Sequence, residues 1–142
     1  MFGILDISVS GMVAQRTRQA AIAANYANKD VILDANGNPE PYRARHVMFS
    51  PGDPTATSVA GRGMGVHVSE IAIDESPISY KWDPGHPLAI KDGPMRDYVP
   101  QPNVNPVIEQ INMLEASRAY EANVAAAEAT KSMVAQSLRM LA

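Results

Sequence analysis

The three histidines are the side chains in this sequence best suited to metal binding or proton transfer, but their spacing favours neither. His46, His67 and His86 lie about twenty residues apart, and none has a second histidine three or four residues away. Zinc sites built on one element need such paired ligands. We therefore interpret the histidines as surface or sheet-edge residues, with assembly of a zinc site from distant segments as the alternative.

Other catalytic patterns are also missing from the sequence. There is no cysteine, the acidic residues are evenly spread, and no serine lies in a nucleophile-elbow motif. Gly61, Gly63 and Gly65 lack the lysine-serine ending of a phosphate-binding loop, and they predict a flexible hairpin loop. We therefore expect no enzyme activity, no catalytic residue, no cofactor, no metal and no small-molecule substrate.

The composition restricts the partners and the location. The 142 residues are 46% hydrophobic and 19% charged, with a net charge of −3 and scattered basic residues, which argues against nucleic-acid binding. No run of about 18 apolar residues predicts a transmembrane segment. The apolar stretch from Met1 to Val9 has no basic residues before it, so we expect no cleaved secretory signal.

Proline placement divides the sequence into three parts. All eleven prolines lie between Pro39 and Pro106. Because proline breaks helix interiors, this pattern predicts a helix at each end and an irregular β region between them.

The C-terminal segment is the strongest helix prediction. Asn105 can cap the first backbone N–H groups, and Pro106 suits the first helical position. Mainly apolar positions then alternate in steps of four and three, the spacing of a coiled-coil seam. They are Met113, Ser117, Tyr120, Val124, Ala127, Lys131, Val134, Leu138 and Leu141.

The N-terminal segment, from about Ile4 to Asn28, also predicts a helix. Leu5, Val9 and Met12 form one apolar stripe. The five polar residues from Gln15 to Gln19 encircle the helix, because successive residues turn by about 100°. We expect this polar belt to find hydrogen-bond partners on neighbouring subunits.

The middle of the chain predicts a small antiparallel sheet. Residues 42–49, 65–74 and 78–82 alternate partly between apolar and polar side chains. Asn36-Gly37 predicts a tight turn in which both residues can take positive φ. The segment from Asp83 to Pro87 is either a contact loop or a rigid turn that closes the sheet.

Together these patterns predict an α+β fold. Long N- and C-terminal helices flank a small antiparallel β domain, and the C-terminal helix carries a coiled-coil-like seam that needs a partner. We expect the N-terminal helix in residues 1–30, a proline-rich β domain in 31–104 and the C-terminal helix in 105–142. Periodicity alone leaves two functions open, a subunit of a helical tube and a soluble helical adaptor.

Four motifs, in order, distinguish between these functions. They are Leu5–Ser8 followed by Ala14–Arg18, then Asp83–Pro87, then Pro102–Asn105, and finally Ala116–Val124. The combination resembles the family of proximal rod proteins of the bacterial flagellar basal body. Other rod or hook axial proteins, which share the terminal helices, are the nearest alternative.

The resemblance implies a structural protein that assembles with itself and with other rod proteins into the drive shaft for motility. It also implies export by the flagellar type III apparatus without a cleaved signal, and a location in the periplasmic part of the basal body. The resemblance further implies that the long N- and C-terminal helices pack together as a coiled-coil-like pair and form the rod core, with the small antiparallel β domain between them in sequence. The assembly contacts we expect are Leu5, Val9, Met12, Arg16, Arg118, Tyr120, Asn123, Val124, Val134 and Leu138.

Two segments depart from the pattern usual in that family. Asn25-Tyr26-Ala27-Asn28 replaces an Asn-Ile-Ala-Asn run at the end of the first helix. In the second, Pro94 to Asp97 separate a glycine and a tyrosine that are usually adjacent. We therefore expect an enlarged loop before the long helix.

Overall fold

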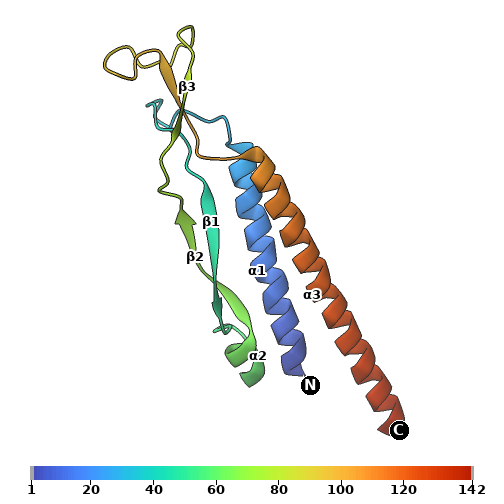
Figure 1. Ribbon diagram of the computed structural model, residues 1–142. Coiled ribbons are helices and arrows are strands. Elements are labelled where there is room, and N and C mark those ends of the chain that lie inside the picture. The colour runs from blue at the N-terminus through green and yellow to red at the C-terminus, as the bar shows by residue number, and fades with distance from the viewer. Residues whose placement is uncertain (1, 142) are drawn as a thin grey trace.

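The computed structural model describes residues 2–141 and confirms the α+β class. Two long helices enclose four short strands and one short helix in sequence order (Figure 1). The elements are α1 Phe2–Ala27, β1 Arg45–Pro51, α2 Val59–Met64, β2 Val66–Ile73, β3 Ser79–Trp82, β4 Tyr98–Gln101 and α3 Pro106–Leu141. Among the described residues, no helix is long and apolar enough to cross a membrane.

The long helices have well-defined ends close to the β region. At the end of α1, Asn28 Nδ2 donates to the Ala24 carbonyl at 2.7 Å. At the start of α3, Asn105 Oδ1 accepts from the backbone N–H groups of Val107 at 3.0 Å and Ile108 at 3.4 Å. This geometry confirms the predicted cap, which satisfies donors that have no partner inside the helix.

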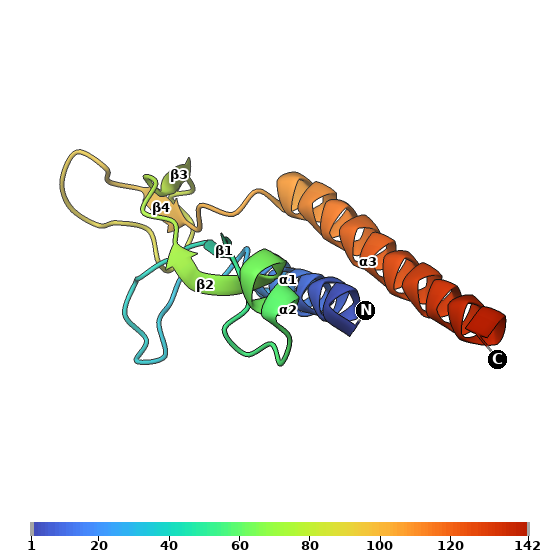
Figure 2. The ribbon, with the colours of Figure 1, turned by 90° about the horizontal axis from the view of Figure 1, so that it is seen from below.

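The molecule has three layers, with α1 in the middle. The β1–β2 hairpin and α2 pack on one side of α1, and α3 packs on the other (Figures 1 and 2). The helices α1 and α3 run antiparallel, and α3 continues past the start of α1. Thus α1 is covered by the chain on two sides, whereas α3 is covered along one side only.

The strands form two sheets rather than the one predicted. Strands β1 and β2 pair antiparallel, with a register shift between Met48 and Phe49, and β3 pairs antiparallel with β4. Strand β4 was not predicted, because Pro100 lies inside the strand and Pro102 follows it. Each strand of a two-stranded ribbon has a free edge, which allows a proline without losing a ladder hydrogen bond.

The prediction of a flexible glycine loop at residues 61–65 was wrong. The segment includes most of α2, whose N-cap Ser58 accepts from the Gly61 N–H at 3.0 Å. A Cβ atom on Gly61 would lie 2.9 Å from Asp6 Cβ. Glycine is therefore needed here for close approach of α2 to α1 rather than for flexibility.

The predicted turn at Asn36-Gly37 is present, but its geometry differs. Only Gly37 has positive φ, at 84°. Asp34 Oδ1 accepts from the backbone N–H groups of Asn36 and Asn38, both at 2.8 Å. These bonds, chiefly that from Asn38, lower the pKa of the Asp34 carboxyl. The carboxylate therefore organises the turn in place of a second residue with positive φ.

The segment from Asp83 to Pro87 forms a turn next to the β3–β4 ribbon. The His86 N–H donates to the Asp83 carbonyl at 3.2 Å, and the Leu88 N–H donates to His86 Nδ1 at 3.1 Å. The ribbon and its loops lie at the end of the molecule opposite the two chain termini (Figure 1). The geometry favours the rigid-turn interpretation, and a contact role for this turn stays a prediction.

Candidate assembly interface

The contact between α1 and α3 is built from small side chains. Ala14 is 2% exposed and Ala116 is fully buried. A Cβ atom on Gly11 would lie 2.7 Å from Asn123 Oδ1, so glycine allows the two helices to approach here. With few large side chains between them, the helices gain less from apolar burial than a thick core would provide.

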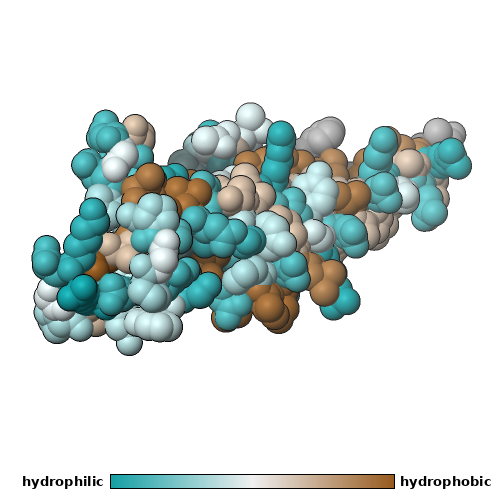
Figure 3. Space-filling view, turned by 90° about the horizontal axis from the view of Figure 1, so that it is seen from above, coloured by the Kyte–Doolittle hydropathy of each residue, from teal (hydrophilic) through white to brown (hydrophobic). Residues whose placement is uncertain are grey.

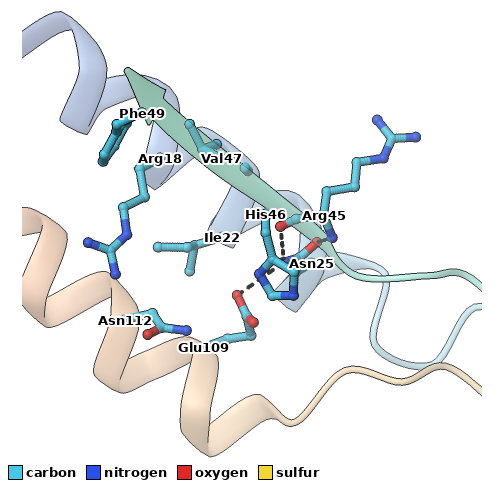
Figure 4. A pocket seen from close by; sticks show the side chains of 10 residues that line it. Arg18, Ile22, Asn25, Arg45, His46, Val47, Phe49, Glu109 and Asn112 are labelled. Carbon is cyan, nitrogen blue, oxygen red and sulfur yellow. Dashed lines mark hydrogen bonds between the residues drawn. The ribbon is translucent and has the colours of Figure 1, made fainter. Parts of the chain in front are cut away.

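Asn25 is the centre of a hydrogen-bond network at the end of the helix pair where α1 ends and α3 begins (Figure 4). Its side chain is 1% exposed and uses its full hydrogen-bonding capacity. Nδ2 donates to the Arg45 carbonyl at 2.9 Å and to Glu109 Oε2 at 3.3 Å, while Oδ1 accepts from the Arg45 N–H at 2.9 Å and the Tyr42 hydroxyl at 3.0 Å. We call Asn25, Tyr42, Arg45 and Glu109 the polar hub, because it joins α1, β1 and α3.

The Tyr42 hydroxyl is a reliable donor in this hub. Burial raises the pKa of Tyr42 above its ordinary value. The group therefore keeps its proton at neutral pH and continues to donate to Asn25.

Asn103 holds the linker between β4 and α3 with two hydrogen bonds, which we call the Asn103 clamp. Asn103 Oδ1 accepts from the Ala44 N–H at 2.8 Å, and Asn103 Nδ2 donates to the Asp74 carbonyl at 3.2 Å. One side chain thus ties the linker to the start of β1 and the end of the hairpin. In the Pro102–Asn105 motif, Asn103 positions the linker and Asn105 starts the helix.

The polar belt finds much of its bonding within the chain, contrary to our expectation. Arg18 forms an ion pair with Glu115 at 3.5 Å, and Gln19 Nε2 donates to Ser117 Oγ at 3.3 Å. Arg16 is exposed, and Gln15 Oε1 is buried with no hydrogen-bond partner among residues 2–141. The expectation of partners on other subunits failed for Arg18 and Gln19, because both lie against α3 of the same chain.

The ten predicted assembly residues divide into two groups by exposure. The half-buried group comprises Leu5, Met12, Tyr120, Asn123, Val124 and Val134, and the exposed group comprises Val9, Arg16, Arg118 and Leu138. Val9 is 48% exposed, whereas Leu5 and Met12 are half-buried. The three residues of the expected stripe therefore do not form a single contact surface. Contacts of either group with other subunits stay predictions.

Sequence reasoning missed the polar hub. The run from Asn25 to Asn28 stood out only as a departure from the rod pattern, and Glu109 carried no signal at all. A buried asparagine and an exposed one look alike in an amino-acid sequence. Their roles depend on which backbone groups the fold brings within hydrogen-bond distance.

Both long helices also carry apolar side chains on the surface. On α3, Val107, Ile111 and Leu114 are 63%, 53% and 52% exposed. On α1, Val9 and Val13 are 48% and 60% exposed. The space-filling view shows apolar patches between polar side chains on the face that it displays (Figure 3). Within the described part of the chain, no group of His, Cys, Asp or Glu is arranged to hold a metal ion.

Comparisons with known proteins point to one family. Residues 95–140 match the family described as flagellar basal body rod FlgEFG protein C-terminal. Flagellar basal-body rod protein FlgC of Borreliella burgdorferi is 37% identical over 150 residues, covering 99% of this chain and 97% of that protein. The FlgC proteins of Buchnera aphidicola subsp. Schizaphis graminum and Salmonella typhimurium are 41% identical over 138 residues and 35% identical over 144 residues. These two alignments cover 97% and 99% of this chain and 96% and 97% of the respective relatives. The chain therefore belongs to the family of flagellar basal-body rod protein FlgC, a structural subunit of the bacterial flagellar rod.

Proposed function

We propose that the α1–α3 pair forms part of the core of the proximal rod, with the helices of neighbouring subunits packed against its outer faces. The observation that carries this proposal is the exposure of Val107, Ile111 and Leu114 on the side of α3 away from α1. These residues follow one another at the three- and four-residue spacing of a single helix face. A helix with apolar side chains on both sides is suited to burial between two neighbours.

Burial of this face supplies a driving force for assembly. Fully burying a side chain of this size contributes roughly 1.5–3 kcal/mol. A contact that covers Val107, Ile111 and Leu114 together is then worth several kcal/mol before the cost of ordering the partners is subtracted. A structure that carries torque needs many such contacts around its axis.

The β region extends the proposed role away from the helix pair. The β3–β4 ribbon makes no substantial packing against either long helix. In this arrangement the helices make the rod core, and the β domain, residues 31–104, lies further from the axis. The subunit acts mechanically, with copies of itself and other rod proteins as partners and without a catalytic step.

The proposal includes a route and a place. The chain leaves the cytoplasm through the flagellar type III export apparatus without loss of a signal peptide, and it resides in the periplasmic part of the basal body. Mass spectrometry of basal-body protein should then detect peptides from residues 2–18. A mature start beyond residue 15 would contradict this route.

Deletion and localisation test the rod assignment. Cells lacking the chain should form no hooks or filaments, because everything beyond the proximal rod depends on it. A tagged copy should restore swimming and remain with detergent-extracted basal bodies. Hooks and filaments in the deletion strain, or a tagged protein found only in a soluble complex, would overturn the proposal.

A further inference from the structure

Glu109 is a buried carboxylate without a cationic partner in the described chain. The residue is 5% exposed and lies in the first turns of α3. It accepts a hydrogen bond from Asn25 Nδ2 at 3.3 Å, and none of the ion pairs among residues 2–141 includes it. The start of α3 offers partial positive charge, but a buried carboxylate is costly unless a full charge is paired with it.

The basic side chains that share a cleft with Glu109 are engaged elsewhere, and His46 among them lies with Nε2 3.5 Å from Asp74 Oδ2. Arg18 and Arg45 border the cleft between β1 and the helix pair (Figure 4). Arg18 pairs with Glu115, and the Arg45 guanidinium lies over the Tyr42 ring, 5.9 Å from its centroid. Neither supplies the charge that Glu109 lacks.

Glu109 also borders a second, mainly apolar pocket between the end of α1 and the start of α3. This pocket has a volume of about 430 Å³, and Glu109 is the only charged residue that lines it. We call it the Glu109 pocket. Its lining residues are Ile22, Ala23, Tyr26, Ala27, Glu109, Gln110 and Met113.

We propose that the Glu109 pocket receives an arginine or lysine side chain from a neighbouring rod subunit, with Glu109 as its counter-ion. Such a side chain has an aliphatic stem and a charged head. The stem matches the walls formed by Ile22 and Met113, and the head matches the carboxylate. Tyr26, which accepts from Gln110 Nε2 at 3.4 Å, adds an aromatic face at which a cation is favoured. This inference rests on the rod function proposed above.

The proposal predicts opposite effects of one substitution on the free chain and on the assembly. Glu109→Gln removes the charge and keeps one oxygen that can accept from Asn25, while an NH2 group replaces the second carboxylate oxygen. In the free chain the uncompensated charge disappears, so the helix pair is held at least as firmly. In the rod the incoming cation loses its partner and is left buried without one.

Competition for incorporation measures the effect on the rod. Cells produce equal amounts of tagged wild-type and tagged Glu109→Gln chains, and basal bodies are purified. We expect the variant to be underrepresented in them by at least about fivefold. Glu121→Gln is the matched control, because it removes the same charge from an exposed position of α3 and should be incorporated like the wild type.

Amide hydrogen exchange measures the effect on the free chain. In Glu109→Gln, exchange across residues 107–113 should be as slow as in the wild type or slower. Faster exchange would show that the carboxylate is already stabilised inside the chain, and equal incorporation would show that the rod does not use its charge. Either result overturns the pocket proposal. If wild-type chain itself is absent from basal bodies, the rod function fails instead.

The identity of the incoming group can be tested by suppressors of Glu109→Lys. Placing a cation in the pocket should block swimming by repelling the arriving side chain. Restored swimming through an Arg or Lys to Glu change in a rod subunit would support the proposal. Suppressors confined to Asn25, Tyr42 and Arg45 would overturn it, because they would assign the defect to the polar hub alone.

Discussion

The two ends of α3 are held in different ways. At its start, Asn105 caps the helix and Glu109 joins the polar hub, so the position of this end is fixed by directional hydrogen bonds. Beyond Thr130, which is buried, α3 continues past the start of α1, and every residue with a described side chain except Val134 is exposed. The chain therefore specifies the geometry of one end by itself, while the other end presents side chains to its surroundings.

This difference shows that one end of α3 fixes the geometry of the subunit, while the other end offers apolar surface for burial. Hydrogen bonds of a buried amide require partners at set distances and angles, so the hub permits one arrangement of α1, β1 and α3. Exposed apolar side chains gain by burial against many surfaces. The hub thus fixes the shape of the subunit, and in the rod arrangement proposed above the exposed faces supply attraction to neighbouring subunits.

Breaking the contact between the helices should have the largest effect. Val124 is half-buried and follows Asn123, which lies against Gly11. Val124→Asp places a carboxylate there without a cation and should lower the free energy of unfolding by roughly 3 kcal/mol. Thermal unfolding of the purified chain measures this loss, with Ala125→Asp at an exposed position as the matched control. Equal unfolding of the two variants would place Val124 in solvent. Cells carrying Val124→Asp should also fail to swim.

Removing the centre of the polar hub should come next. Asn25→Ala leaves the Tyr42 hydroxyl, both backbone groups of Arg45 and Glu109 without this partner. We expect a loss of about 2–3 kcal/mol, because buried polar groups without partners keep their desolvation penalty. Chemical denaturation measures it, and the exposed Asn36→Ala serves as control. A loss no greater than in the control would mean that water replaces the amide at no cost.

The fold was more predictable from sequence than the site. Proline placement located both long helices, and Asn105 with Pro106 marked the start of α3, because these signals act through local backbone geometry. The β3–β4 pairing and α2 were missed. Both depend on contacts with distant segments, such as the close approach of Gly61 to Asp6.

The roles of individual polar residues were the least predictable part. Arg18 and Gln19 were assigned to neighbouring subunits on the basis of helix periodicity, but they bind Glu115 and Ser117 of the same chain. Periodicity shows which residues share a face, and it does not show what covers that face. Asn25 likewise acquires its role only when β1 and α3 reach it.

A smaller effect is expected at the cap of α3. Asn105→Ala removes the side-chain oxygen that accepts from Val107 and Ile108, at a cost of about 1 kcal/mol. Asn105→Ser should recover most of the loss, because serine is also a good N-cap. Circular dichroism during thermal unfolding compares the three chains. If Asn105→Ala and Asn105→Ser unfold at the same temperature, the start of α3 is held by the hydrogen bonds of Asn103 rather than by the cap.

The smallest effect on the free chain is expected at the other end of α3. Leu138 is 62% exposed and lies beyond the contact with α1. Leu138→Ser should change the free energy of unfolding by no more than about 0.5 kcal/mol, as is usual for substitutions on an open surface. The same variant should be incorporated less than the wild type in competition for basal bodies, since the apolar group is then missing from a contact between subunits. Gln136→Ser, at an exposed position two residues earlier, controls for the loss of side-chain size. A marked destabilisation of the purified Leu138→Ser chain would show that this end of α3 packs against its own subunit, and normal incorporation would remove Leu138 from the proposed assembly contacts.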